Sequence, residues 1–473
     1  MVLDVIADEG ENLKSKVLKK KYYCKNNKKK KQQPFPPSEI FKFSDYDCVA
    51  FDLDNTVCRY KVGNIMRLEY QLIAEYLVHK YGYDQSLLLP LEDDIDFIQK
   101  GLIFDIKRGN FLKVSTKGEI LRATHGTCPM TRCQILDTYG KNKIWEPVLK
   151  FAETLYDQAN SEHIRSFKDY FDMPAAVACA RAIDAEDRSE DGPPEVYDVW
   201  PDIHVALCSL YRREYYRCDK GGFFPEIKNN PDFYLYEVSE RTRKWLKSLK
   251  EHTFTFLISG SSIDYASHIS QFVLGENWRE YFDMVVFTAK KPGFFTGNKP
   301  FLELDGIDDG KQVPFSELRI DGTYANGNWD ELYQLVKQES GVEKPHCLYV
   351  GDHICQDTMT PFLKGIDTVA VVEEMAAEGM TGDPLAHEDG SDLMSSFWGS
   401  YFTTDGNNKV MGNDRINNLY ASVPLKCSRI AIPFLDVVSR YSIRHPFTAF
   451  TKDTSGFFPG TLLYYIFDIY YYY

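Results

Sequence analysis

The sequence predicts an α/β protein with a parallel sheet as its core and a mainly helical insertion. Short apolar runs of β-favouring residues recur along the chain, and segments with helical spacing lie between most of them. Polar side chains directly follow several of these runs. Because ligands of open parallel sheets bind beyond the carboxyl ends of the strands, the same pattern predicts where a functional site lies.

Composition limits the classes of function. The chain has 473 residues and a net charge of −14, which argues against stable nucleic-acid binding but permits a local phosphate site. Its 11 cysteines are scattered without a C-x-x-C pair, so we expect reduced thiols in a cytoplasmic protein rather than zinc ligands. No apolar stretch is long enough for a helix that spans a membrane, so we expect no membrane span.

Residues 1–40 are predicted to form a basic, disordered tail. Lysines crowd the stretch from Lys14 to Lys31, and three prolines follow it. A segment of this composition cannot bury enough apolar surface to fold by itself. Nuclear import and contact with an anionic surface both stay open as roles for the tail.

The first part of the core is expected to cover residues 41–125. Cys48 to Phe51 is predicted to be a buried strand because it is apolar, β-rich and too short for a helix. Apolar residues at helical spacing then predict a helix from Ile65 to Tyr81. Between Gly101 and His125, short apolar runs separated by glycine-containing turns predict a β-hairpin insert.

Residues 126–240 are predicted to be mainly helical. The clearest helical segments are Trp145 to Ala159 and Ile203 to Tyr216, and an acidic loop that ends in two prolines lies between them. An amphipathic helix from Glu237 to Leu249 then leads back to the core.

The second part of the core is expected to cover residues 241–385. Trp329 to Gln338 has helical spacing, and residues 386–473 are interpreted as a C-terminal extension with one candidate strand at Ser428 to Pro433. Four apolar runs predict the strands of this part: Phe254–Ile258, Met284–Phe287, Cys347–Val350 and Thr368–Val372.

Carboxylates stand where two of the predicted strands should end. Asp52 and Asp54 follow the first strand, and Asp352 follows the strand that ends at Val350. They could share one Mg²⁺, the usual cation where phosphate is another ligand, with Asp54 contributing its backbone oxygen. Asp52 could then attack a phosphorus atom to form an aspartyl-phosphate. Asp54 could protonate the leaving oxygen and later deprotonate the attacking water.

Three further polar residues complete the predicted site. Ser259 and Lys291 follow the next two predicted strands, and Asp357 comes shortly after Asp352. The Ser259 hydroxyl and the Lys291 ammonium would hold the phosphoryl oxygens, and Asp357 would orient the lysine or a metal-bound water. Each residue alone could be a turn, cap or surface residue. Their shared position after β-runs is what predicts a common site.

With these residues assigned, the chain resembles the haloacid dehalogenase superfamily of phosphohydrolases. The four motifs of that superfamily match Asp52-Leu53-Asp54-Asn55-Thr56, Ser259, Lys291 and Gly351-Asp352 to Asp357. Within it, the chain is most similar to the cytosolic purine 5′-nucleotidase family and its 5′-nucleotidase domain-containing branch. Five stretches carry this closer likeness: Gly101–Asp105, Gly109–Lys113, His125-Gly126, Lys291–Phe295 and Gly351–Ile354.

The resemblance implies a haloacid dehalogenase-type, Rossmann-like core with a helical cap inserted after the first helix. It also implies Mg²⁺, a nucleoside monophosphate as the first substrate to test, and Asp52 as the nucleophile. The second motif departs from the family, because Ser259-Gly260-Ser261 stands where characterised purine nucleotidases have Thr-Asn-Ser. The base-binding residues of the cap also lack clear counterparts. Composition alone offers Phe151, Tyr156, His204, Tyr211 and Tyr215.

The leading hypothesis from the sequence is a Mg²⁺-dependent phosphomonoester hydrolase, a 5′-nucleotidase that acts through an aspartyl-phosphate. Two alternatives stay open. A non-catalytic interaction protein could retain the same fold, and a phosphotransferase or a phosphatase of non-nucleotide phosphates would use the same site. The sequence also leaves room for a homo-oligomer.

Overall fold

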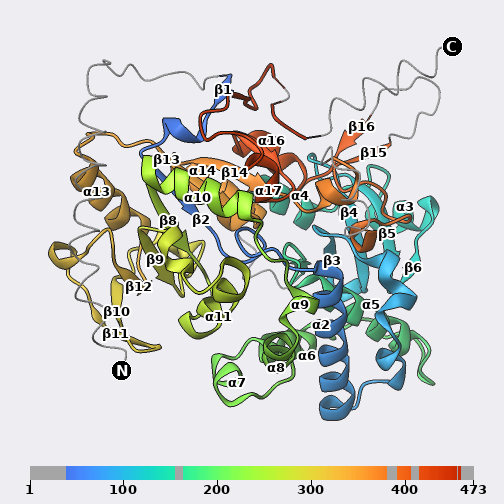
Figure 1. The fold of residues 1–473 in the computed structure, drawn as a ribbon. Coiled ribbons are helices and arrows are strands. Elements are labelled where there is room, and N and C mark those ends of the chain that lie inside the picture. Colours follow the sequence, from blue (N-terminus) through green and yellow to red (C-terminus); the bar gives the residue numbers. More distant parts are fainter. Residues whose placement is uncertain (1–38, 155–162, 381–390, 406–414, 455, 460–473) are drawn as a thin grey trace.

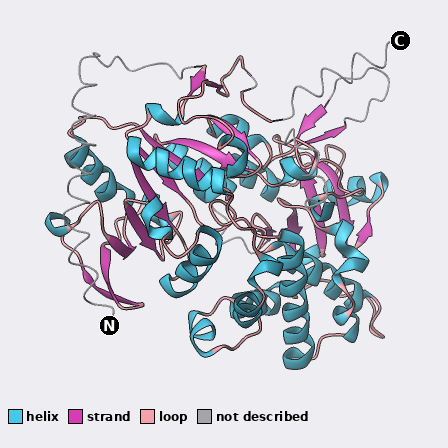
Figure 2. Cartoon of the chain, in the orientation of Figure 1, coloured by secondary structure: helices cyan, strands magenta, loops and turns pink. Residues whose placement is uncertain are grey.

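Two β-sheets and their helices dominate the computed structural model, which describes residues 39–154, 163–380, 391–405, 415–454 and 456–459. Figure 2 shows the strands of the two sheets as separate groups, with the larger sheet on the left and the smaller one on the right. Residues 1–38 of the predicted tail and the last residues of the chain lie outside the described residues, whereas Ile40 at the end of the predicted tail belongs to a strand. None of the described helices combines the length and apolarity that crossing a membrane requires.

The large sheet has nine strands in the order β11-β10-β12-β9-β8-β2-β13-β14-β17. The run from β12 to β17 is parallel, whereas β10 and β11 are antiparallel at one edge. The strands are β2 (Cys48–Phe51), β8 (Phe254–Ile258), β9 (Met284–Phe287), β10 (Phe301–Asp305), β11 (Asp308–Gln312), β12 (Thr323–Asn326), β13 (Cys347–Gly351), β14 (Asp367–Val371) and β17 (Ile430–Ile432).

Helices lie before and after these strands. In chain order they are α2 (Val62–Tyr76), α3 (Arg132–Tyr139), α4 (Glu146–Thr154), α5 (Met173–Asp187), α6 (Trp200–Leu210), α7 (Arg213–Cys218), α8 (Phe223–Asn229), α9 (Pro231–Tyr234), α10 (Glu240–His252), α11 (Ile263–Leu274), α12 (Gly293–Thr296), α13 (Trp329–Ser340), α14 (Thr360–Leu363), α15 (Glu374–Ala377), α16 (Ser422–Cys427) and α17 (Leu435–Val438).

Alternate residues of the central strands enter two separate apolar clusters. In β2, Val49 and Phe51 share a cluster with residues of α10 and α11. Cys48 and Ala50 instead share a cluster with residues of α12 and α13. Because successive side chains of a strand point to opposite faces, helices cover the sheet on both sides. The predicted α/β core with a mainly parallel sheet is therefore present.

The smaller sheet is antiparallel, in the order β6-β5-β4-β3-β7. Its strands are β3 (Ile103–Asp105), β4 (Asn110–Val114), β5 (Ile120–His125), β6 (Cys128–Pro129) and β7 (Ile164–Ser166). The first three are the predicted hairpin region, and β7 comes from the mainly helical region that follows. This sheet lies among α2, α3, α5 and α6, on the right in Figure 1. We call residues 77–239 the insert, because the chain leaves the large sheet before them and returns at β8.

One predicted helix differs from the structure. Ile203 to Tyr216 was expected to be continuous, but α6 ends at Leu210 and α7 begins at Arg213. Arg212 between them has an extended backbone. The Tyr211 hydroxyl donates hydrogen bonds to the buried Glu69 carboxylate on α2 and to the Phe171 carbonyl. Anchoring Tyr211 to these partners turns the chain at this point.

The C-terminal extension joins the large sheet. The candidate strand at Ser428 to Pro433 is confirmed as β17, which pairs in parallel with β14. Two small sheets also form, from β1 (Ile40–Phe41) with β18 (Phe447–Thr448) and from β15 (Thr403–Asp405) with β16 (Arg415–Asn417). The helix predicted from Trp145 to Ala159 corresponds to α4 as far as Thr154, and its remainder lies outside the described residues.

Candidate active site

The predicted site residues follow four neighbouring strands of the large sheet. β9, β8, β2 and β13 lie side by side and run in parallel, so their carboxyl ends share one edge. The Asp52 N–H donates to the Val350 carbonyl at 2.9 Å, and the Ser259 N–H donates to the Val286 carbonyl at 2.9 Å. These bonds extend the strand pairing to the residues that carry the functional groups.

Three carboxylates form a buried cluster at this edge. One oxygen from each of Asp52, Asp352 and Asp357 lies within 4.8 Å of the others. Asp52 and Asp352 are each 7% exposed, and Asp357 is fully buried. The sequence interpretation put Asp357 behind the metal ligands, whereas the structure places its carboxylate beside the other two. The Thr56 hydroxyl also donates to Asp352 Oδ1, at 3.5 Å.

Lys291 bridges two members of this cluster. Its Nζ lies 2.8 Å from Asp52 Oδ1 and 2.7 Å from Asp357 Oδ1, and it also donates to the Tyr349 hydroxyl at 3.2 Å. Burial alone lowers the pKa of Lys291, but the charges of Asp357 and Asp52 outweigh it and hold the pKa well above its usual value. The two carboxylates therefore favour the charged form of the lysine at the edge of the sheet.

The local backbone explains how Asp357 reaches the cluster. Asp357 lies in a π-helical turn (Ile354–Met359), and its carboxylate accepts a hydrogen bond from the His353 N–H at 3.2 Å. A Cβ added at Gly351 would lie 2.4 Å from the Asp357 Cβ. Only glycine at 351 leaves room for Asp357, which is a physical reason for the Gly351-Asp352 pair.

Asp54 has a different environment from Asp52. Its carboxylate accepts hydrogen bonds from the Tyr60 hydroxyl and the Ser261 hydroxyl, each at 2.8 Å. Burial and then the charge of Asp52 raise the pKa of Asp54 to about 6, although these two hydrogen bonds oppose the rise. A carboxyl with this pKa can exchange a proton near neutral pH, as a general acid and base must.

The residues present fit a hard divalent cation. Burial, followed by the charges of Asp169, Asp52 and Asp357, raises the pKa of Asp352 well above its usual value. Asp52 Oδ1 is buried, and its charged partner among the described residues is the Lys291 ammonium at 2.8 Å. A shared cation would remove the electrostatic penalty of ionising these acids together, and carboxylate oxygens are the ligands that Mg²⁺ prefers.

Comparisons with known proteins identify the family of the chain. Residues 38–390 match the model of the 5′ nucleotidase family, a range that contains all six predicted site residues. The chain belongs to this family. It is 31% identical over 442 residues to 5′-nucleotidase domain-containing protein 1 of Bos taurus and 31% identical over 449 residues to that of Homo sapiens. Each alignment covers 89% of this chain and 96% of the relative.

A relative with lower identity has a similar name. The 5′-nucleotidase domain-containing protein 2 of Rattus norvegicus is 24% identical over 346 residues, which are 71% of this chain and 58% of the relative. The resemblance to the cytosolic 5′-nucleotidase family, read from the motifs, is thus confirmed at the level of the family.

The sequence did not predict which residues donate hydrogen bonds to Asp54. Ser261, rather than Ser259, donates to the Asp54 carboxylate, while Ser259 Oγ accepts from the Ser261 N–H at 3.0 Å. Tyr60 lies six residues after Asp54 and its hydroxyl also contacts that of Tyr265, at 3.0 Å. The only sequence signal was the second hydroxyl of Ser259-Gly260-Ser261, because no spacing rule marks Tyr60 or Tyr265.

The aromatic candidates of the insert have mostly structural contacts. Tyr211 is bonded to Glu69, the His204 ring lies 5.3 Å from that of Trp200, and Phe151 is buried near Tyr420. Tyr156 lies outside the described residues.

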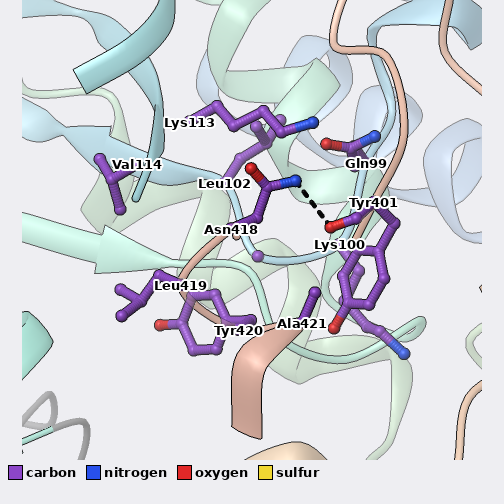
Figure 3. A pocket seen from close by; sticks show the side chains of 11 residues that line it. Gln99, Lys100, Leu102, Lys113, Val114, Tyr401, Asn418, Leu419, Tyr420 and Ala421 are labelled. Carbon is purple, nitrogen blue, oxygen red and sulfur yellow. Dashed lines mark hydrogen bonds between the residues drawn. The ribbon is translucent and has the colours of Figure 1, made fainter. Parts of the chain in front are cut away.

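A small cavity lies away from the acidic cluster, between the first hairpin region and the C-terminal extension. Its volume is about 20 Å³, enough for roughly one water molecule. Figure 3 shows Lys113, Tyr401 and Asn418 around it, and the Asn418 amide donates to the Tyr401 carbonyl at 2.8 Å. None of the predicted site residues lines this cavity, so it is a packing feature and not the active site.

Proposed function

We propose that this protein is a Mg²⁺-dependent phosphomonoester hydrolase, a 5′-nucleotidase that acts on nucleoside monophosphates through an aspartyl-phosphate. The buried cluster of Asp52, Asp352 and Asp357 with Lys291 is the observation that carries the proposal. The family match and the names of the relatives support the substrate class.

Asp52 is the proposed nucleophile. Its carboxylate forms a new bond to phosphorus as the bond from phosphorus to the leaving oxygen breaks. Lys291, beside Asp52 and Asp357, stabilises the negative charge on the phosphoryl oxygens, and the hydroxyl groups of Ser259 and Ser261 lie on the neighbouring loop. Mg²⁺ held by Asp52, Asp352 and the Asp54 backbone oxygen, with Asp357 close by, would offset the repulsion between carboxylate and phosphate.

Asp54 is the proposed proton donor and acceptor. It gives its proton to the leaving oxygen, which departs as an alcohol, and then takes a proton from the water that attacks the aspartyl-phosphate. The second step releases inorganic phosphate and restores the Asp52 carboxylate. Hydrogen bonds from Tyr60 and Ser261 hold Asp54 in place for both transfers.

The proposal includes a haloacid dehalogenase-type core, formed by residues 41–125 and 241–385, with residues 126–240 as a mainly helical cap. Strand β3 of the first part pairs with strand β7 of the cap in an antiparallel arrangement, and this pairing joins the two regions. A cytoplasmic location is part of the same proposal, and the cysteines of the described residues are all free thiols, which is consistent with it.

The test is a panel of phosphate monoesters with and without Mg²⁺. We expect the wild-type protein to hydrolyse nucleoside monophosphates only with the metal, and Asp52→Asn to reduce kcat by at least about 1,000-fold because the nucleophile is lost. Asp137→Asn, at an exposed position of α3, is the matched control and should keep full activity.

Each outcome of the panel has a meaning. Equal activity in wild type and Asp52→Asn would exclude the aspartyl-phosphate route. Turnover of sugar phosphates or phosphopeptides alone would replace the nucleotidase assignment with another phosphatase. No turnover of any phosphate by a folded, Mg²⁺-loaded protein would leave the non-catalytic interaction protein as the better account.

A further inference from the structure

We propose that Tyr265 is a positioning residue for the proton transfers of Asp54 and that it acts through the hydroxyl of Tyr60. This inference rests on the proposed function, because it concerns the same site and the same reaction. It deepens that function by giving a role to a side chain that lies outside the four motifs.

Hydroxyl groups hold both oxygens of the Asp54 carboxyl group. The Tyr60 hydroxyl donates to Oδ1 and the Ser261 hydroxyl donates to Oδ2, each at 2.8 Å. Because hydrogen bonds weaken steeply when their geometry is poor, two such bonds restrict rotation of the carboxyl group. The direction in which Asp54 presents its proton therefore depends on where Tyr60 and Ser261 lie.

The hydroxyl of Tyr265 supports that of Tyr60. The two hydroxyl oxygens are 3.0 Å apart. A tyrosine hydroxyl has one hydrogen, and Tyr60 donates its hydrogen to Asp54, so Tyr265 is the donor between the two tyrosines. Both side chains are buried, with exposed fractions of 1% for Tyr60 and 6% for Tyr265. In such surroundings one hydrogen bond of a chain strengthens the next, so the outer hydroxyl supports the bond to Asp54.

One segment of the core supplies both supports of Asp54. Ser261 lies in the loop after β8, and Tyr265 lies in the first turn of α11. The connection from β8 to α11 thus reaches one oxygen of Asp54 directly and the other through Tyr60. A shift of α11 would disturb both contacts together.

Aromatic rings of the insert hold the two tyrosines in place. The ring of Phe224 on α8 lies edge-on to the ring of Tyr265 at 5.0 Å, and that of Tyr216 on α7 does so at 5.8 Å. The ring of Phe171 lies edge-on to that of Tyr60 at 5.3 Å. Such edge-to-face contacts are favourable and depend on ring orientation. The insert therefore helps to orient the proton donor of the core.

The expected consequence is a dependence on the leaving group. In the first step the bond from phosphorus to the leaving oxygen breaks, and this oxygen takes the proton of Asp54. A nucleoside needs this proton to depart as an alcohol, whereas p-nitrophenolate is stable without it. A poorly oriented Asp54 should therefore slow the nucleotide reaction more than the hydrolysis of p-nitrophenyl phosphate. The measured quantity is the ratio of kcat/KM for the nucleoside 5′-monophosphate to kcat/KM for p-nitrophenyl phosphate. The amount of folded enzyme cancels in this ratio.

The experiment compares wild type with Tyr265→Phe and Tyr46→Phe. Each change removes one hydroxyl from a tyrosine. The Tyr46 hydroxyl donates to Asp367 Oδ2 at 2.7 Å, at the start of β14 and hence at the opposite edge of the sheet from the site. We expect Tyr265→Phe to lower the ratio about fivefold, which corresponds to the loss of one hydrogen bond. Tyr46→Phe should leave the ratio unchanged.

A second comparison tests whether Tyr265 acts through Tyr60. Tyr60→Phe should lower the ratio at least as much as Tyr265→Phe, because it removes the direct bond to Asp54. If the effect of Tyr265 passes through Tyr60, adding Tyr265→Phe to Tyr60→Phe should change the ratio by less than about twofold.

The outcomes separate this inference from the proposed function. If wild type hydrolyses both compounds and Tyr265→Phe leaves the ratio within about twofold, the role of Tyr265 is wrong while the proposed function stands. An equal fall of the ratio in Tyr46→Phe, or a full additional effect of Tyr265→Phe in the Tyr60→Phe protein, would also overturn it. If wild type hydrolyses neither compound, the proposed function fails and this inference fails with it.

Discussion

At the scale of single residues, the buried lysine Lys113 links the first hairpin region to the C-terminal extension. Its Nζ donates to the carbonyls of Trp398 and Ser400 at 2.6 and 2.7 Å, and the residue is 4% exposed. Figure 3 shows the Lys113 side chain beside the small cavity. Burial, with the charge of Arg122 in addition, lowers the pKa of Lys113 to about 7. A neutral amine still has two hydrogens, which suffice for these two carbonyls.

This pKa predicts a pH-dependent stability. Between about pH 7 and 10.5 the unfolded lysine binds a proton that the folded lysine lacks, so the free energy of unfolding rises with pH across this window. We expect the unfolding free energy of wild type to rise by roughly 2 kcal/mol relative to that of Lys113→Met from pH 7 to pH 9. Denaturant titrations at the two pH values measure it. A constant difference would show that Lys113 stays charged in the folded protein.

At the scale of elements, α7 ties the insert to the far edge of the large sheet. Arg217 donates to Asp264 at 2.8 Å at the start of α11, and to Asp308 and the Ile307 carbonyl at 2.8 and 2.9 Å in the β10–β11 hairpin. Arg213 adds a second contact to Asp264, at 3.4 Å. Two arginines one helical turn apart can reach the same acid because residues i and i+4 share a face of a helix.

We expect Arg217→Ala to loosen this connection without unfolding the protein. The arginine is partly exposed to solvent, so the loss of global stability should be small. Hydrogen exchange should become faster in α7 and the β10–β11 turn and stay unchanged in β2 and β13. Lys244→Ala, which removes an exposed pair with Glu240 on α10, is the control. Unchanged exchange in α7 would show that packing alone holds it.

At the scale of the whole molecule, the C-terminal residues complete the core. β17 is an edge strand of the large sheet, and the fully buried Trp398 donates from Nε1 to the Phe97 carbonyl at 2.7 Å. The Trp398 ring also lies 6.0 Å from the ring of Phe97. The extension therefore contributes to both the large sheet and the packing of the insert.

Removing this anchor should destabilise the whole protein. Trp398→Ala is expected to lower the free energy of unfolding by about 3–5 kcal/mol, because it leaves a cavity and an unpaired Phe97 carbonyl. Leu363→Ala, at a position 62% exposed, should change it by less than about 0.5 kcal/mol. Denaturant unfolding followed by two probes measures both. A loss below 1 kcal/mol in Trp398→Ala would show that the extension folds independently of the rest.

The sequence by itself determined the strands and the identity of the chemical groups. Runs such as Cys48–Phe51 and Met284–Phe287 are apolar throughout because both faces of a parallel sheet are buried, and this pattern is visible without a structure. Asp52, Asp352, Lys291 and Asp357 could be assigned to one edge because strand ends in such a sheet converge.

Only the tertiary structure decided which groups touch. Asp357 joins the acidic cluster through a π-helical turn over Gly351, and Ser261 and Tyr60 hold Asp54, although no local spacing marks these contacts. The loop between β7 and α5 also reaches the same edge, through Tyr170 and Phe171. Contacts between side chains of distant segments are determined by how whole elements pack against one another. The periodicity of the sequence indicates only which residues of each element are buried.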